Sequence, residues 1–67
     1  MTIYIDNQQY HLADGATVAE ALALVENLPN GGFAVANGST VVPRDTWHST
    51  PLEEGAKLKI FKAFFGG

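Results

Sequence analysis

An amphipathic helix in the first half of the chain is the feature that most constrains this sequence. Thr17-Val18-Ala19-Glu20 is a capping box, in which the threonine hydroxyl accepts from the backbone N–H three residues on and Glu20 reaches back to the cap. The apolar residues after the cap follow i, i+3, i+4 and i+7 spacing and so form one stripe, made of Val18, Ala21, Leu22 and Val25. Asn27 and Pro29 stop the pattern. We therefore predict a helix of about three turns that ends around residues 26–28.

Short segments on both sides of this helix have strand character, because they are rich in β-branched and aromatic residues and are bounded by turn residues. They are residues 2–5, 9–12, 33–36, 40–42 and 57–61. Asp6-Asn7-Gln8 and Asn37-Gly38-Ser39 supply the turns of two hairpins. Residues 43–47 are predicted to make a single helical turn, since proline is tolerated at the first helical position, and Trp47 should fold back on the core.

The last strand alternates in polarity, which predicts a sheet with one buried face and one solvated face. Leu58 and Ile60 should face the core, whereas Lys57, Lys59 and Phe61 should face solvent. The order of elements is strand, strand, helix, strand, short strand, strand. This order predicts an α+β fold of the β-grasp type, a mixed sheet of four to five strands on one main helix. A different α+β roll with the same elements is the rival.

Composition excludes several classes of protein. The chain has 67 residues, no cysteine and two histidines, so disulfides, thiolate chemistry and a metal cage are all excluded or disfavoured. A domain of this length buries only ~60% of its unfolded surface, which disfavours a deep active site and hence an enzyme. Seven acids against four bases disfavour nucleic acid. There is neither an export signal nor an apolar run that could span a membrane, so we expect a cytoplasmic protein, a monomer when alone.

The end of the chain, Phe64-Phe65-Gly66-Gly67, is the candidate functional feature. We expect one domain over residues 1–64 and a flexible tail over residues 65–67. An extended Gly-Gly tail has no side chains, so it can be threaded through a narrow channel and place its carboxylate beside a nucleotide. Adenylation by ATP would then turn this poor electrophile into an anhydride with a good leaving group. A frayed terminus or an expression scar is the alternative explanation of two final glycines, which here follow a predicted strand directly.

The whole chain resembles the ThiS family, the ubiquitin-like sulfur carrier proteins of thiamine biosynthesis. The resemblance is carried by the capping-box helix, by the strand at residues 33–37, and above all by Val42-Pro43-Arg44-Asp45-Thr46-Trp47, which is similar to the family's V-P-R-x-x-W segment. Residues 52–58 are similar to the family's lead into the last strand. The resemblance implies that the chain is a carrier and not an enzyme.

By this resemblance, Gly67 is adenylated by a ubiquitin-activating-type adenylyltransferase and becomes a thiocarboxylate that gives its sulfur to thiazole synthase. A sulfur donor protein would load it. The carrier itself would bind no cofactor, and ATP would be used by the activating partner.

Contact with partners is expected at the solvated face of the sheet and at the base of the tail. Phe65 and Gly66 should enter the partner with Gly67. The candidate surface residues are Phe61, Lys59, Lys62 and Arg44, because aromatic and basic side chains often anchor interfaces. Phe61 can equally be an edge residue of the core, and Arg44 a capping or surface ion-pair residue. Trp47 is expected to be part of the core.

Three other functions stay open at this point. The related sulfur carrier of molybdopterin synthesis also ends in Gly-Gly, although the V-P-R-x-x-W stretch argues against it. A ubiquitin-like modifier would join Gly67 to target lysines through an isopeptide bond. An interaction module with an inert tail would lose no activity on removal of Gly66 and Gly67.

Overall fold

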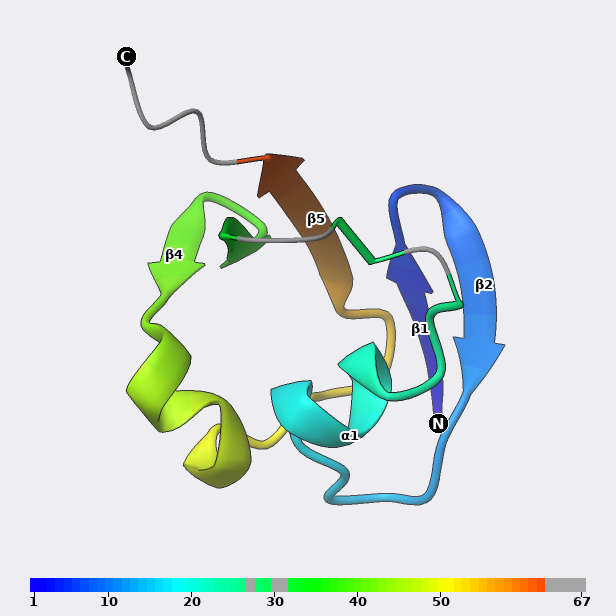
Figure 1. Ribbon diagram of the computed structural model, residues 1–67. Helices are drawn as coiled ribbons and strands as arrows, with labels where there is room; N and C mark the ends of the chain where they lie inside the picture. Colours follow the sequence, from blue (N-terminus) through cyan, green and yellow to red (C-terminus); the bar gives the residue numbers. More distant parts are fainter. Residues whose placement is uncertain (27, 30–31, 63–67) are drawn as a thin grey trace, which may run out of the picture.

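The computed structural model describes residues 1–26, 28–29 and 32–62. Five strands form one mixed sheet in the order β2-β1-β5-β3-β4. One α-helix and one 3₁₀ helix lie in the lower part of the molecule in the view of Figure 1. The elements are β1 (Thr2–Ile5), β2 (Gln8–His11), α1 (Val18–Leu22), β3 (Phe33–Asn37), β4 (Thr40–Val42), η1 (Arg44–Ser49) and β5 (Lys57–Lys62). The predicted α+β arrangement of a mixed sheet with one main helix is thus confirmed.

The last strand of the chain is the central strand of the sheet. β5 pairs parallel with β1 on one side, with Ile5 opposite Leu58, and antiparallel with β3 on the other, with Val35 opposite Ile60. A parallel pair needs a long crossover, and here the chain between β1 and β5 contains α1, β3, β4 and η1. The chain beyond residue 62 therefore starts from the middle of the sheet rather than from an edge.

Two tight turns close the predicted hairpins. Asp6 and Asn7 both have positive φ, 49° and 68°, which is the backbone of the type I′ turn that matches the twist of an antiparallel pair. Aspartate and asparagine are among the few non-glycine residues that tolerate this conformation. The two-residue turn Gly38-Ser39 between β3 and β4 differs, since only its first residue has positive φ, 63° at Gly38, which is the pattern of a type II′ turn with glycine at that position.

The start of the helix was predicted correctly and its end was not. The Thr17 side chain accepts from the Glu20 backbone N–H at 3.3 Å, and the Glu20 carboxylate accepts from the Thr17 N–H at 3.1 Å, so the capping box is formed. However, α1 ends at Leu22 instead of around residues 26–28. The next N–H groups, of Leu24 and Val25, bond to carbonyls three residues back. The chain tightens to 3₁₀ geometry, in which an i, i+3 apolar pair such as Leu22 and Val25 still shares one face.

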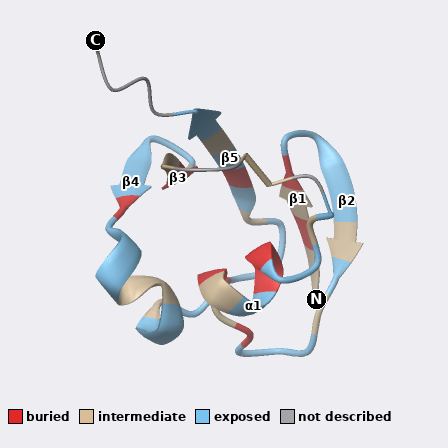
Figure 2. Cartoon of the chain, in the orientation of Figure 1, coloured by how far each residue is buried: buried red, intermediate tan, exposed pale blue. Residues whose placement is uncertain are grey.

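The core lies between the sheet and the two helices. Figure 2 shows buried residues on β1, β5 and α1. Ile3, Val18 and Val35 are the largest fully buried side chains. The buried cluster consists of Ile3, Ile5, Val18, Ala21, Leu22, Val35, Val42, Leu52 and Leu58. In the part of the chain that the structure describes, no helix is long and apolar enough to cross a membrane.

Candidate functional site

The end of β5 is the described part of the molecule closest in sequence to the predicted tail. Lys62 is the last residue of β5 and the last one that the structure describes. The predicted attachment residue Gly67 and the predicted tail residues Phe65 and Gly66 lie outside the described residues, as does Phe64. The site is therefore built here from the strands and side chains that surround residues 59–62.

Phe61 lies on the solvated face of the sheet, as predicted. It alternates with the buried Leu58 and the partly buried Ile60, and its side chain is 46% exposed. Its partner across β3 is Ala34, whose small side chain leaves the phenylalanine ring uncovered from that direction. An exposed aromatic ring next to the end of the central strand is an apolar contact surface of the kind that interfaces use.

Lys59 extends this surface along the same face. It stands opposite Ala36, and Val41 of β4 stands on the other side of the same alanine. Ala36 is only 5% exposed, although it lies outside the core cluster and between two register partners with longer side chains. Val41 itself is 62% exposed. We call Phe61, Val41, Ala34, Ala36 and Lys59 the outer-face patch.

The structure places the other two predicted partner residues away from this patch. Lys62 follows Phe61 and so alternates to the helix side, opposite Phe33 of β3. Arg44 is the first residue of η1, and its guanidinium carbon lies 5.4 Å from the centre of the Phe33 ring. Phe61 and Lys59 thus occupy one face of the sheet, whereas Arg44 and Phe33 lie on the other.

The geometry of η1 explains the spacing within Val42-Pro43-Arg44-Asp45-Thr46-Trp47. In a 3₁₀ helix, side chains three residues apart eclipse one another, so Arg44 lies over Trp47 with 5.2 Å between the guanidinium carbon and the ring centre. The Trp47 ring stacks on Phe33 at 5.4 Å, and its Nε1 donates to the Val42 carbonyl at 2.9 Å. Trp47 is half-buried and packs against the core, as predicted. A single helical turn was predicted for residues 43–47, and the structure instead has η1, a six-residue 3₁₀ helix that begins at Arg44, after Pro43, and continues to Ser49.

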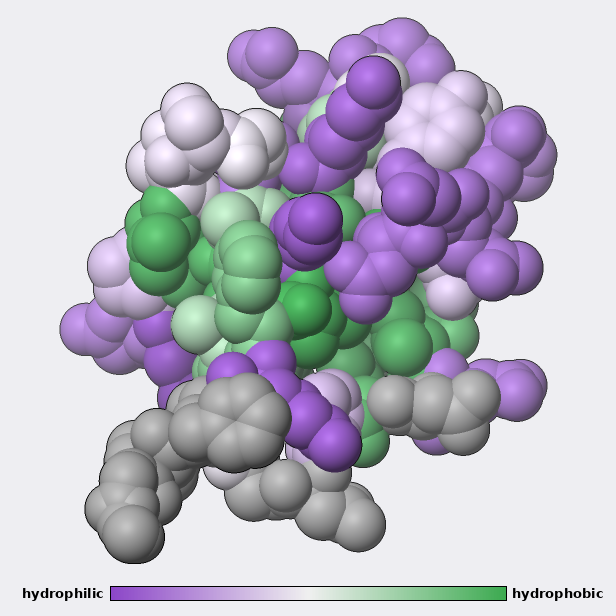
Figure 3. Space-filling view, turned by 90° about the horizontal axis from the view of Figure 1, so that it is seen from above, coloured by the Kyte–Doolittle hydropathy of each residue, from purple (hydrophilic) through white to green (hydrophobic). Residues whose placement is uncertain are grey.

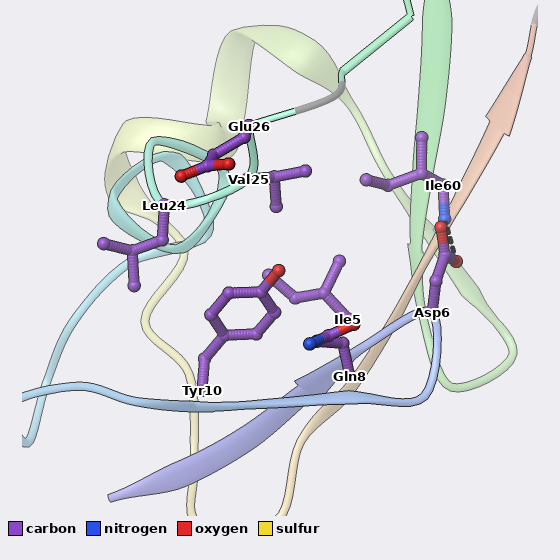
Figure 4. Close-up of a pocket in the computed structure, with 8 residues that line it drawn as sticks. All are labelled: Ile5, Asp6, Gln8, Tyr10, Leu24, Val25, Glu26 and Ile60. Carbon is purple, nitrogen blue, oxygen red and sulfur yellow. Dashed lines mark hydrogen bonds between the residues drawn. The ribbon is translucent and has the colours of Figure 1, made fainter.

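Asp6 is a residue of the site that sequence reasoning missed. Its side-chain Oδ1 accepts from the backbone N–H of Ile60 at 3.1 Å, as the dashed line in Figure 4 shows. β1 ends at Ile5 and turns away, so this carboxylate continues the pairing of β5 beyond the last parallel rung. The sequence assigned Asp6 only to the turn, because no local pattern links residues 54 positions apart.

A groove on the helix side borders the same strand. It has a volume of about 510 Å³ and is lined by Ile5, Asp6, Gln8, Tyr10, Leu24, Val25, Glu26 and Ile60. Figure 4 shows Ile5 and Tyr10 from the hairpin, Val25 and Leu24 from the turns after α1, and Ile60 from β5 around one space. Seen from the end of the molecule where β5 finishes, hydrophobic side chains occupy the centre of the surface (Figure 3). The groove was not predicted, since it forms only when these three segments meet.

The described residues offer no cage for a metal ion. No three histidine, aspartate or glutamate side chains gather among them. The ion pair found there joins the N-terminal ammonium to Asp14 at 3.6 Å.

The sheet order, the parallel central pair and the single α-helix define a β-grasp protein of the ubiquitin-like class. The crystal structure of the thiamine biosynthesis protein ThiS from Geobacter metallireducens has the same fold, with a TM-score of 0.80, 17% identity and full coverage of both chains. The family model of ThiS matches residues 3–67, and the chain belongs to this family. The sulfur carrier protein ThiS of Escherichia coli (strain K12) is 30% identical over 67 residues, which is all of both chains.

Membership in this family makes the chain a sulfur carrier of thiamine biosynthesis and not an enzyme. The resemblance seen in the sequence is thereby confirmed, and so is the predicted β-grasp fold. In general terms, a carrier of this family works with an activating enzyme and with thiazole synthase.

Proposed function

We propose that Gly67 is the sulfur attachment site and that its carboxylate becomes a thiocarboxylate. The family match carries this proposal, because it runs to residue 67 and so includes the terminal Gly66-Gly67 pair. The position of β5 supports it, since Lys62, the last described residue of this central strand, is only five positions before Gly67. Glycine suits a threaded tail because it has no side chain to clash with a channel wall.

The proposed chemistry takes place in three steps on the activating enzyme. A carboxylate oxygen of Gly67 attacks the α-phosphorus of ATP, which forms an acyl-adenylate and releases pyrophosphate. In the second step the terminal sulfur of a persulfide on the donor protein attacks the carbonyl carbon and AMP leaves, which forms an acyl disulfide. A thiol reductant then cleaves its S–S bond, so that the donor thiol is released and the thiocarboxylate remains on Gly67. One C–O bond of the carboxylate is thereby replaced by a C–S bond, and the loaded carrier gives this sulfur to thiazole synthase.

The carrier's own contribution is presentation and recognition. Phe65 and Gly66 enter the channel of the partner with Gly67, while the folded domain stays outside. The outer-face patch around Phe61 and Lys59 supplies apolar contact with one positive charge. Lys62 and Arg44 supply positive charge on the helix side. Arg44, Lys59, Lys62 and Phe61 are all exposed, so each can reach a partner without unfolding the domain.

No cofactor needs to be held by this chain in the proposed reaction, because the activating enzyme binds the ATP. Since adenylation consumes ATP, the reaction belongs in the cytoplasm. The carrier acts as a monomer that meets its enzymes one after another.

Intact mass spectrometry tests the proposal. The chain is incubated with ATP, the adenylyltransferase of the same organism and a sulfur source. We expect a mass gain equal to the exchange of one oxygen for sulfur, located in the peptide that contains Gly66 and Gly67. Covalent attachment to other proteins would instead indicate a modifier, and an unchanged mass with an active enzyme would contradict both.

Variants of the tail provide the control for that measurement. Gly66→Val and deletion of Gly67 should abolish loading, because the first blocks the channel and the second removes the reacting carboxylate from its place. Circular dichroism should show an unchanged fold for both. Loading of either variant at the wild-type rate would contradict the role of the tail.

A further inference from the structure

The guanidinium of Arg44 is held in place by aromatic rings on the molecular surface. Its central carbon lies 5.2 Å from the centre of the Trp47 ring and 5.4 Å from that of Phe33. The two rings are themselves stacked at 5.4 Å with an interplanar angle of 28°. Both distances are within the range at which a cation is attracted to the face of a ring. Arg44 is therefore an exposed side chain whose head group is oriented before any partner arrives.

The backbone below this stack is fixed by hydrogen bonds. Trp47 Nε1 donates to the carbonyl of Val42, and both the N–H and the Oγ1 of Thr46 donate to the carbonyl of Pro43, at 3.0 and 2.8 Å. Thr50 Oγ1 in turn donates to the Thr46 carbonyl at 2.7 Å. A bound arginine normally loses rotamer freedom on association, and a side chain ordered in advance loses less.

The N–H groups of this guanidinium meet no acceptor in the part of the chain that the structure describes. No hydrogen bond from the Arg44 side chain and no carboxylate within 4.0 Å of it is found there. The guanidinium carbon lies over the two rings, and the rings accept none of its N–H groups in a conventional hydrogen bond, so its planar set of five N–H donors remains for a partner. Such a fork fits a carboxylate with two parallel hydrogen bonds.

The stack stands beside the strand from which the tail starts. Phe33, on which Arg44 lies, is the register partner of Lys62, the last residue of β5. A protein that receives the tail must approach this end of the sheet. It then meets Arg44 and Lys62 on the helix side, where both are exposed.

We propose that Arg44 is a specificity residue for the protein that activates the tail, and that its guanidinium takes a carboxylate side chain of that adenylyltransferase. The inference rests on the proposed function. It names the activating enzyme because this enzyme receives the carrier with its unmodified carboxylate. A fixed cation with unused donors complements an acidic group, and interfacial pairs of this kind control both partner choice and binding rate.

Titration calorimetry of the full chain with the adenylyltransferase, without ATP, tests this assignment. Arg44→Met keeps an apolar stem over the rings and removes the charge, so we expect binding about tenfold weaker, which corresponds to ~1.4 kcal/mol. Arg44→Lys keeps the positive charge but loses the planar pair of N–H donors. Its affinity should therefore lie between that of the wild type and that of Arg44→Met. Lys57→Met removes the same charge at the opposite end of β5 and should bind within about twofold of wild type.

Two further measurements distinguish an effect of Arg44 on partner recognition from an effect on folding. The dissociation constant of Arg44→Met should depend less on salt than that of the wild type, because one charge pair is missing. The melting temperature of each variant shows whether it is folded at the temperature of the titration. Wild-type affinity in Arg44→Met, or equal losses in Arg44→Met and Lys57→Met, would overturn the inference.

Failure of the inference is distinguishable from failure of the proposed function. Binding is measured without ATP, whereas loading is measured by mass. If the wild type is loaded and Arg44→Met binds as tightly, the sulfur carrier function stands and the role of Arg44 is lost. If the wild type binds but is never loaded, the proposed chemistry fails while the comparison of Arg44 variants still decides how the enzyme is recognised.

Discussion

The carboxylate of Asp6 accepts a hydrogen bond from the backbone N–H of Ile60 at 3.1 Å, across 54 positions of sequence. It takes the place of a strand partner where β1 turns away from β5. Two residues after Ile60 the described part of the chain ends at Lys62. The base of the tail is thus held by β3 through backbone pairing on one side and by this single side chain on the other.

Replacement of Asp6 should loosen the last residues of β5. Asp6→Ala removes the acceptor and places alanine at a positive φ of 49°, so we expect a loss of roughly 2 kcal/mol in the free energy of unfolding. Asp6→Asn keeps an acceptor oxygen and the tolerance for this backbone, and it should lose less. Hydrogen exchange of the Ile60 amide is the direct measurement. Equal protection in Asp6→Ala and wild type would refute the role given to this bond.

The outer-face patch should contribute to partner binding without contributing to the fold. Phe61→Ala removes an aromatic ring that is 46% exposed, and we expect binding to the adenylyltransferase to weaken about tenfold or more, as at an interface hot spot. Thr40→Ala, at an exposed position of β4, is the control. Calorimetric titration measures both affinities. If the melting temperature of Phe61→Ala is much lower than that of the wild type, the ring contributes to the stability of the fold and the prediction is contradicted.

Leu22 and Leu24 should respond in opposite ways to the same substitution. Leu22 is 4% exposed in the core cluster, so Leu22→Ala should cost roughly 2–5 kcal/mol through the cavity it leaves. A loss of this size can unfold a small domain. Leu24 is 44% exposed, and Leu24→Ala should change stability by no more than about 0.5 kcal/mol. Urea unfolding gives both values, and similar losses at the two positions would contradict the burial described here.

The capping box should make a measurable contribution to the stability of the protein, although α1 has only five residues. Thr17→Ala leaves the Glu20 N–H without its acceptor, and we expect a loss of about 1 kcal/mol. Thr17→Ser keeps the hydroxyl and should stay close to wild type. Thermal unfolding followed by circular dichroism compares the three proteins. Equal melting temperatures for the alanine and serine variants would show that the cap makes no net contribution.

Local patterns in the sequence predicted a large share of this molecule. The bounds of β1 and β4, the two hairpin turns, the capping box and the alternation of Leu58, Ile60 and Phe61 were all predicted, because each depends on residues within a few positions of one another. The terminal glycines and the segment from Val42 to Trp47 also pointed to the family.

Tertiary structure decided the features that depend on distant residues. It ended α1 at Leu22, since a tightened turn brings Val25 to the core as well as a longer helix would. It joined Asp6 to Ile60 and set Arg44 over Phe33. It also divided the predicted partner residues between two sides of the sheet. The sequence determined periodicity and turn chemistry, which are short-range, whereas the contacts around the base of the tail exist only because the sheet order brings residues 6, 33, 44 and 60 to neighbouring strands and turns.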